Sequence, residues 1–239
     1  MTKNKQLTLI TRQENRALPL KKMLEKNGYK VLIEPIFKII PLKHKKINVD
    51  DYSAIMITSL NTIEILSKKK TYNKLKKIKT FCVGSVTYKA AQEEGYNCIF
   101  TNSISAKSLE KEIIKYINPS NKKILIIGGK KIAYNPISNF NKANLKSERV
   151  VIYDTKSIKY LSNKCQEAIK NKIIKNIIIY SPETAKMFLN LVNPINIKEC
   201  KIICLGKKTG NIFKNLNWKK IQVIDDINLK NFAKAIIDD

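Results

Sequence analysis

The segment Ile55-Met-Ile-Thr-Ser-Leu-Asn-Thr-Ile-Glu-Ile-Leu66 occurs twice in this chain, in two related forms. The second form is Ile177-Ile-Ile-Tyr-Ser-Pro-Glu-Thr-Ala-Lys-Met-Phe188, which places Ser181 122 positions after Ser59 (181 − 59). Each form begins with a short apolar run that predicts a strand, and continues with apolar residues at helical spacing. The serine between them is well placed to cap the helix, since its hydroxyl can accept a hydrogen bond from a backbone N–H of the first turn.

A second pair of matching segments follows at the same interval. Phe81-Cys-Val-Gly-Ser-Val-Thr-Tyr-Lys-Ala-Ala91 matches Ile203-Cys-Leu-Gly-Lys-Lys-Thr-Gly-Asn-Ile-Phe213, and Thr209 again lies 122 positions after Thr87 (209 − 87). An ungapped match over two consecutive strand–helix units predicts that the chain arose by duplication. A chain of 239 residues can hold two small domains, and the duplication favours two over one.

Predicted strands and helices alternate along the whole chain; examples are a strand at 53–58, a helix at 86–94 and a helix near 136–145. The strands are short continuous apolar runs, which are typical of parallel strands covered on both faces. We therefore predict two doubly wound, flavodoxin-like α/β lobes, each with a parallel sheet of about five strands. Ligands of such sheets bind beyond the carboxyl ends of the strands. The residues predicted there are Thr11, Arg12, Ser59, Gly84, Gly128, Gly129, Ser181 and Gly206.

The formal net charge of +27 has two interpretations. It can indicate a polyanionic partner, either nucleic acid or a substrate with many carboxylates. It can also reflect a composition rich in Lys, Ile and Asn, of the kind that an A+T-rich genome produces. Arg, the better residue for bidentate phosphate contacts, occurs only at Arg12, Arg16 and Arg149. We therefore interpret most Lys as solvated surface, and the charge alone does not identify a partner.

Several classes of site lack their motifs. The turns contain no G-x-G-x-x-G and no G-x-x-x-x-G-K-[ST], so no dinucleotide or nucleoside triphosphate site is predicted. The single histidine, His44, lies in a Lys-rich segment, where we expect it to be exposed rather than catalytic. The five cysteines form no C-x-x-C motif, and we interpret them as structural residues that pack as small apolar side chains. We predict no cofactor and no metal; what remains are hydroxyls and helix N-termini that can hold anions.

The sequence indicates a cytoplasmic location. No apolar run approaches the roughly 20 residues of a membrane helix. Leu7-Thr-Leu-Ile10 is too short for the apolar part of a signal peptide. We therefore expect no membrane partner.

Several segments of the chain match the motifs of a known family: Leu9–Arg12, Pro35 with Ile40-Pro41, Met56–Ile63, Cys82–Ala91 with Gly95-Tyr96, Ile152-Tyr153, Ile179–Ala185 and Cys204–Thr209. Through these segments the chain resembles the uroporphyrinogen-III synthase family over nearly its whole length. Two positions and one turn depart from the family pattern. Tyr88 and Gly210 replace a small Ala after the threonine, and the turn at Gly128-Gly-Lys-Lys131 lacks a following Arg.

The resemblance implies a particular division of the chain. A plain tandem repeat would divide it near position 119, whereas family members combine the N-terminal segment with the C-terminal half. The expected lobes are therefore 1–36 with 157–239, and 42–150. Two linker strands, 37–41 and 151–156, would join them.

The resemblance also implies an activity. The family cyclises hydroxymethylbilane to uroporphyrinogen III with loss of water and inversion of the last ring through a spiro intermediate. In this chain Tyr153 would assist departure of the hydroxyl as a weak acid. The groups expected to bind the substrate carboxylates are Thr11, Arg12, Ser59, Asn61, Thr87, Gly129, Ser181 and Thr209.

The expected partner is a small-molecule substrate, with no nucleic acid bound. We expect a monomer, and a transient contact with the hydroxymethylbilane-producing enzyme stays open. The alternative from another class is a two-lobed polyanion-binding protein without catalysis. That alternative would require basic and aromatic residues concentrated on one face, whereas Lys is spread evenly along the sequence.

Overall fold

The structure, a computed structural model, describes residues 6–218, 220–226 and 228–238. The chain divides into two compact units, with boundaries between Lys38 and Ile39 and between Thr155 and Lys156. We call the unit formed by the two outer segments lobe 1 and the middle unit lobe 2. Both boundaries fall within strands, so the chain passes between the lobes in extended segments.

Lobe 1 contains a five-stranded sheet of order β11-β10-β9-β1-β2, whose neighbouring strands are all parallel. The isoleucines of its central strand alternate between two cores. Ile177 and Ile179 lie in one core, while Ile178 lies in the other. Both faces of the strand are therefore buried, which explains its continuous apolar sequence. The strands are β1 (Leu7–Ile10), β2 (Lys30–Ile33), β9 (Ile174–Ile179), β10 (Lys201–Leu205) and β11 (Ile221–Ile224).

Helices cover both faces of this sheet. α6 (Asn163–Lys170), α7 (Pro182–Leu189) and α8 (Lys207–Lys214) contribute Cys165, Phe188 and Phe213 to the core that contains Ile177. α1 (Glu14–Lys26) and α9 (Leu229–Ile237) contribute Leu20, Leu24 and Phe232 to the core that contains Ile178. Complete burial of each such side chain contributes about 1.5–3 kcal/mol. A short 3-10 helix, η3 (Pro194–Ile197), completes the lobe.

Lobe 2 contains a six-stranded sheet of order β3-β8-β7-β4-β5-β6. Its central strand repeats the alternation seen in lobe 1. Ile55 and Ile57 lie in one core, while Ala54 and Met56 lie in the other. The strands are β3 (Phe37–Pro41), β4 (Tyr52–Ile57), β5 (Lys79–Cys82), β6 (Cys98–Ile99), β7 (Lys123–Gly129) and β8 (Ser147–Ser157).

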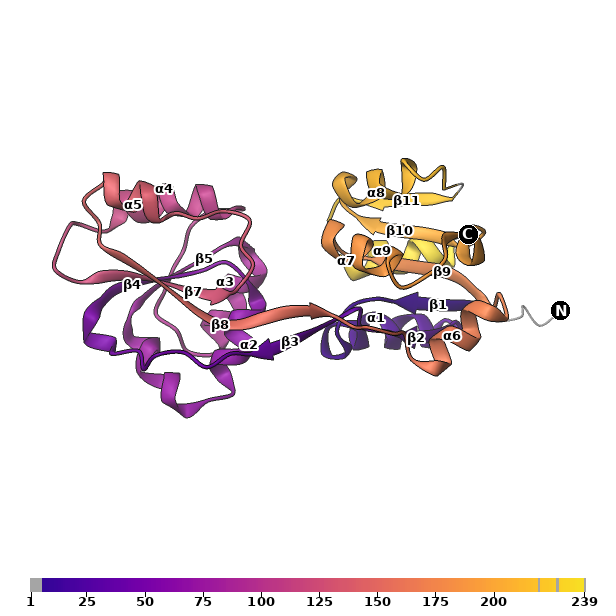
Figure 1. Cartoon of the computed structure of the whole chain (residues 1–239), viewed down its shortest axis with the longest axis horizontal. Helices are drawn as coiled ribbons and strands as arrows, with labels where there is room; N and C mark the ends of the chain where they lie inside the picture. Colours follow the sequence, from indigo (N-terminus) through magenta and orange to yellow (C-terminus); the bar gives the residue numbers. More distant parts are fainter. Residues whose placement is uncertain (1–5, 219, 227, 239) are drawn as a thin grey trace. The chain divides into compact units, whose positions relative to one another are not determined.

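The sheet of lobe 2 also has helices on both faces (Figure 1). α2 (Leu60–Ser67) and α3 (Gly84–Glu93) pack on the face of Ile55, whereas α4 (Ala106–Tyr116) and α5 (Ile137–Lys142) pack on the face of Met56. Two 3-10 helices, η1 (Val49–Asp51) and η2 (Lys70–Lys77), flank β4 and β5. Within the described ranges, no helix combines the length and the apolar composition needed to cross a membrane.

The predicted fold class, two doubly wound α/β lobes with parallel sheets, is confirmed. The sheet of lobe 2 has six strands rather than about five because β3 pairs with the outer side of β8. The two copies of the repeated sequence form the same elements in the same order. β4-α2-β5-α3-β6 in lobe 2 corresponds to β9-α7-β10-α8-β11 in lobe 1. β7 and β1 occupy equivalent places beside β4 and β9.

The cysteines are free and pack as small apolar side chains. Cys82, Cys165, Cys200 and Cys204 are buried, and Cys98 is half-buried. Burial raises the pKa of Cys82 and of Cys204 to about 12, so both thiols stay protonated near neutral pH. The structural interpretation of these residues fits their surroundings.

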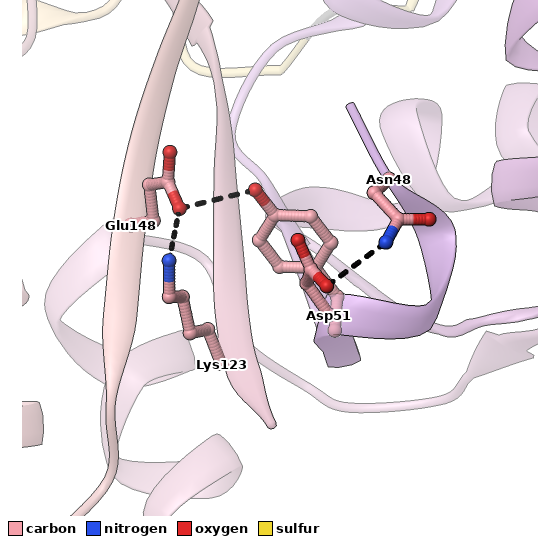
Figure 2. Close-up of polar contacts among 5 residues, drawn as sticks. Asn48, Asp51, Lys123 and Glu148 are labelled. Carbon is pink, nitrogen blue, oxygen red and sulfur yellow. Dashed lines mark hydrogen bonds and ion pairs between the residues drawn. The ribbon is translucent and has the colours of Figure 1, made fainter. Parts of the chain in front are cut away.

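A polar cluster lies where the strands of lobe 2 begin (Figure 2). Lys123 Nζ donates to Glu148 Oε2 at 2.7 Å, and the Tyr52 hydroxyl donates to the same oxygen at 3.2 Å. The hydrogen bond from Lys123 lowers the pKa of Glu148, while burial and then the nearby Glu148 charge raise the pKa of Tyr52 to about 12. This cluster joins β4, β7 and β8 at the sheet edge opposite to the candidate site.

Candidate active site

Equivalent serines begin the helices that follow the two central strands. In lobe 2, Ser59 Oγ accepts a hydrogen bond from the Asn61 N–H at 3.2 Å. In lobe 1, Ser181 Oγ accepts from the Thr184 N–H at 3.1 Å and lies 2.9 Å from Thr184 Oγ1. Both serines are half-buried caps at helix N-termini, as the sequence predicts. The partial positive charge at each N-terminus favours an anion there.

The next strand–helix turn also has the same form in both lobes. Gly84 and Gly206 have φ values of 73° and 76°, a left-handed conformation that glycine adopts without strain. The threonines of these turns, Thr87 and Thr209, are 6% and 1% exposed. Packing explains why position 210 is a glycine, since a Cβ there would lie 2.6 Å from Val223 Cγ2 on β11. The helix can therefore approach its neighbouring strand only with glycine at this position.

The end of β1 in lobe 1 contains a charged and an aromatic group in contact. The Arg12 guanidinium lies 4.3 Å from the centre of the Tyr180 ring, and the centre of this ring lies 5.1 Å from that of the Phe232 ring. Burial raises the pKa of Tyr180, and the adjacent Arg12 opposes this shift. Thr11 is fully buried, and its hydroxyl donates to the Ile178 carbonyl at 2.7 Å. Thr11 thus holds β1 against β9, whereas Arg12 is half-buried.

The end of β7 in lobe 2 packs directly against Tyr153. Gly128 pairs with Val151 but Gly129 pairs with Tyr153, so Ile152 is an extra residue in β8. Such a bulge redirects the side chains that follow it. The ring of Tyr153 lies so close to the backbone that a Cβ on Gly129 would be 2.7 Å from Tyr153 Cε2. Tyr153 is 5% exposed, and only glycine fits beneath its ring.

The sheet order gathers the predicted residues into one group in each lobe. In lobe 1 the order β1-β9-β10 places their carboxyl ends side by side, and in lobe 2 the order β7-β4-β5 does the same. All nine predicted site residues therefore follow strands at the edge where ligands of doubly wound sheets bind, or lie on the bulged strand beside it. The lobe 1 group is Thr11, Arg12, Ser181 and Thr209, and the lobe 2 group is Ser59, Asn61, Thr87, Gly129 and Tyr153.

Comparison with known families agrees with this architecture. The model of the family described as "Uroporphyrinogen-III synthase HemD" matches residues 19–231. The chain belongs to this family. A relative described as "Porphyrin biosynthesis protein HemD", from Ruminiclostridium josui, is 29% identical over 226 residues, which are 89% of this chain. The match spans only 44% of that protein, so this chain corresponds to less than half of its length.

A second relative has a length similar to that of this chain. The "Putative uroporphyrinogen-III synthase" of Methanocaldococcus jannaschii is 27% identical over 227 residues, covering 89% of this chain and 90% of the relative. Among solved structures, the uroporphyrinogen-III synthetase from Helicobacter pylori matches with a TM-score of 0.67 at 15% identity, over 98% of this chain and 99% of that one. A mutant uroporphyrinogen III synthase from Thermus thermophilus matches with a TM-score of 0.54 at 11% identity, over 98% and 99% of the two chains. These structural matches show a shared fold.

The site offers hydrogen-bond donors and positive electrostatic potential. Helix N-termini present backbone N–H groups without intrahelical partners, and Arg12 adds a full positive charge in lobe 1. Across the described residues, no three His, Cys, Asp or Glu side chains gather into a potential metal site. The chemistry that these groups support is the binding of carboxylates and the donation of a proton or hydrogen bond.

Sequence reasoning missed three residues of the site. Thr62 is fully buried, and its Oγ1 has no hydrogen-bond partner within the described part of the chain and faces Gly128, where a Cβ would lie 3.5 Å away. Tyr180 lies under Arg12, and Arg149 contacts the turn after β7. The repeat could have revealed Thr62, because Thr184 lies 122 positions later (184 − 62) in the second copy. The other two depend on contacts that no local pattern indicates.

His44 differs from the expectation of a simply exposed side chain. It is half-buried, with Nε2 2.6 Å from the Tyr72 hydroxyl and Nδ1 2.7 Å from the Lys45 carbonyl. A carbonyl at Nδ1 requires a proton on that nitrogen, so in the neutral ring Nε2 accepts from Tyr72. His44 therefore anchors the segment before β4 to η2.

Proposed function

We propose that this chain is a uroporphyrinogen-III synthase, a cyclising hydro-lyase of tetrapyrrole biosynthesis. It closes hydroxymethylbilane to uroporphyrinogen III with loss of water and inversion of ring D through a spiro intermediate. The observation that carries the proposal is the family match over residues 19–231, which also favours this function over polyanion binding without catalysis. The site adds support, since both lobes present anion-holding helix N-termini, as a substrate with acetate and propionate groups requires.

Departure of the substrate hydroxyl needs a proton or a strong hydrogen bond. Tyr153 is our candidate donor, because it is the ionisable side chain that the bulge of β8 brings against Gly129 at the end of β7. A phenol with a reference pKa of about 10 is a weak acid, so its contribution is smaller than that of a stronger catalytic acid. The hydroxyl leaves as water, and the substituted carbon of ring D then attacks the resulting methylene.

The carboxylates of the substrate are assigned to groups of two kinds. Half-buried groups would contact them directly: Arg12 through its charge, Ser59, Asn61 and Ser181 through helix N-termini, and Gly129 through its backbone. Thr11, Thr87 and Thr209 are buried and would act by holding the adjoining backbone in place. Most binding would then come from the backbone, which explains why so few charged side chains lie at the strand ends.

Positioning is the main catalytic contribution in this proposal. Closure without inversion gives the other isomer spontaneously, so the protein must hold the linear substrate folded for attack by the substituted carbon. Donors fixed on rigid strand ends and helix N-termini meet this need, because they do not reorganise during the reaction. We also propose that the chain acts as a cytoplasmic monomer on this small-molecule substrate.

The test supplies freshly generated hydroxymethylbilane and separates the uroporphyrin isomers after oxidation. The proposal predicts isomer III in clear excess over a control without protein. Formation of isomer I alone, at the spontaneous rate and with folded protein, would refute it. A heat-denatured sample at equal concentration controls for nonspecific effects of the basic surface on the substrate.

A further inference from the structure

The turn after β7 is held by one arginine. Arg149 Nη2 donates to the Gly129 carbonyl at 2.7 Å and to the Lys130 carbonyl at 2.8 Å. Both bonds join a charged donor to a backbone acceptor, a class of hydrogen bond that is stronger than a neutral pair. One guanidinium nitrogen therefore fixes two consecutive peptide units of the turn.

The same turn contacts Tyr153 on two sides. The Lys130 N–H donates to the Tyr153 carbonyl at 2.8 Å, and the Gly129 backbone lies against the Tyr153 ring. The bulge at Ile152 makes this contact depend on the local register of β7 and β8. A displacement of the turn would thus move both the backbone and the ring of Tyr153.

The loop between β7 and α5 is also held at its other end, by a separate set of hydrogen bonds. The Tyr134 hydroxyl donates to Glu110 Oε2 at 2.6 Å, and Asn139 Nδ2 donates to the same oxygen at 3.2 Å and to Tyr134 at 2.9 Å. Glu110 is 2% exposed, so this anchor is built into the core of lobe 2. Loss of Arg149 would therefore loosen the glycine end of the loop and leave the remainder attached.

The residue type is informative in this composition. Of the 46 basic residues only three are Arg, at positions 12, 16 and 149. Lys is a strongly hydrated point charge on a flexible stem, whereas the planar guanidinium loses less freedom for each hydrogen bond formed. Arginine at position 149 fits a requirement for two directed bonds to the turn.

We propose that Arg149 is a positioning residue that acts through the Gly129-Lys130 turn on Tyr153. It fixes the turn so that the Tyr153 ring keeps one orientation when the substrate hydroxyl departs. This inference rests on the proposed synthase function, but it concerns a residue that does not itself contact the substrate. It also supplies, from β8, an arginine for a turn that lacks the following Arg of the family pattern.

The test compares Arg149→Met with Arg149→Lys, and uses Arg16→Met as the matched control from α1. We expect Arg149→Met to lower kcat for isomer III by about tenfold with KM within about twofold, because misplacement of a catalytic group lowers kcat. Arg149→Lys should restore part of the loss, since the ammonium can reach at least one carbonyl. Arg16→Met should keep the wild-type kcat.

Two further measurements separate positioning from a general loss of stability. Amide exchange measured by NMR should be at least about tenfold faster at the Lys130 N–H in Arg149→Met, with the amides of Ile55 and Ile57 unchanged. In a Tyr153→Phe background, Arg149→Met should lower kcat by much less than tenfold, because coupled residues are not additive. Both can be measured on a variant that is less stable but still folded.

Three results would overturn the inference: unchanged kcat in Arg149→Met, equal losses in the two backgrounds, or unaltered exchange at Lys130. If Arg149→Met does not fold, the same comparisons with Arg149→Lys decide the question, with a smaller loss expected. Failure of the synthase proposal is distinguishable, because wild-type protein would then form no isomer III. The exchange measurement needs no substrate and tests the contact with the turn in either case.

Discussion

The two lobes share the repeated strand–helix units but differ at the strand beside them, which is β1 in lobe 1 and β7 in lobe 2. In both, a serine caps the helix after the central strand and a left-handed glycine begins the next helix. Beside these units, lobe 1 has Arg12 stacked on Tyr180, whereas lobe 2 has Gly129 under Tyr153. In our proposal the shared part binds the carboxylates of the substrate, and the differing parts supply a charge in lobe 1 and a phenol in lobe 2.

The difference also appears within the repeated helices. Thr184 Oγ1 lies 2.9 Å from Ser181 Oγ, so the lobe 1 hydroxyl is satisfied within its own turn. The equivalent Thr62 hydroxyl in lobe 2 is buried without a partner among the described residues. An unsatisfied buried hydroxyl costs about 1–3 kcal/mol. The two lobes therefore share one scaffold, and lobe 2 differs from lobe 1 by an unsatisfied Thr62 hydroxyl that lowers its local stability.

The largest expected effect comes from two glycine substitutions that each create a close clash. Gly129→Ala places a Cβ 2.7 Å from the Tyr153 ring, and Gly210→Ala places one 2.6 Å from Val223. Each should lower the free energy of unfolding by about 1–3 kcal/mol, through overpacking. Only Gly129→Ala should also lower kcat, by about tenfold, because it displaces the proposed acid.

The measurement combines isomer III kinetics with thermal unfolding of both variants. An equal loss of kcat in the two variants at matched folded fraction would contradict the assignment of the acid to lobe 2. Loss of stability without loss of kcat in Gly129→Ala would remove the role of the Tyr153 contact.

A smaller effect is expected from the helix caps. Ser59→Ala and Ser181→Ala each remove one cap, which lowers the free energy of unfolding by about 1 kcal/mol. Because both N-termini are assigned to carboxylates, each variant should raise KM by about threefold with kcat nearly unchanged. Steady-state kinetics with each variant checks this. A rise in KM in one lobe only would show that a single lobe holds the carboxylates.

The two equivalent threonines should respond with opposite signs. Thr184→Val breaks the contact with Ser181 and should lower the free energy of unfolding by about 1 kcal/mol. Thr62→Val replaces an unpartnered hydroxyl by a methyl group of similar shape. It should leave the free energy of unfolding unchanged or raise it by about 1 kcal/mol. Denaturant titrations of both variants give the comparison. A loss in Thr62→Val equal to that in Thr184→Val would mean that the Thr62 hydroxyl is satisfied.

The smallest effect concerns acid stability of lobe 2. The pKa of Glu148 is lowered in the folded protein. The contribution of Glu148 to the free energy of unfolding is therefore fully present above the ordinary pKa of a glutamate, and it is lost as the pH falls through the pKa of the folded state. Glu148→Gln should therefore lower the lobe 2 Tm by about 2 °C at neutral pH and less in acid. The pKa of Tyr52 is raised to about 12 in the folded protein. Because the unfolded chain loses this proton at a lower pH, lobe 2 should lose stability as the pH rises from about 10 to about 12.

One tryptophan allows this test to separate the lobes. Trp218 is buried in lobe 1, where its Nε1 donates to the Cys200 carbonyl at 2.9 Å. Its fluorescence reports lobe 1, whereas far-ultraviolet circular dichroism reports both lobes. Glu148→Gln should shift the circular dichroism transition and leave the Trp218 transition in place. A shift of the fluorescence transition alone would contradict the assignment of the cluster to lobe 2.

Much of the fold followed from local patterns. The continuous apolar runs and the repeat predicted the strands and the doubly wound class, and the run at 53–58 became β4 (Tyr52–Ile57). The observed ends of two helices differ from the predicted ends, in both cases near a residue with a left-handed backbone conformation. The helix expected at 86–94 begins at Gly84, which is left-handed, and the helix expected at 136–145 ends at Lys142, shortly before the left-handed Asn144.

The site was less predictable because it depends on register. Strand ends and cap serines can be located from the sequence, so Ser59 and Ser181 were found. The bulge at Ile152, the contact of Arg149 with the turn and the orphaned hydroxyl of Thr62 arise from pairing between distant segments. No local pattern encodes such pairings, since they depend on how β7 and β8 align.

The most direct test of the account substitutes the proposed acid and measures isomer III formation. Tyr153→Phe should lower kcat by about tenfold with KM unchanged, because a weak acid contributes modestly. The matched control is Tyr96→Phe, which removes another buried hydroxyl of lobe 2, one without a partner in the described residues, and should keep full activity. Wild-type kcat in Tyr153→Phe would contradict the central claim that lobe 2 supplies the proton donor.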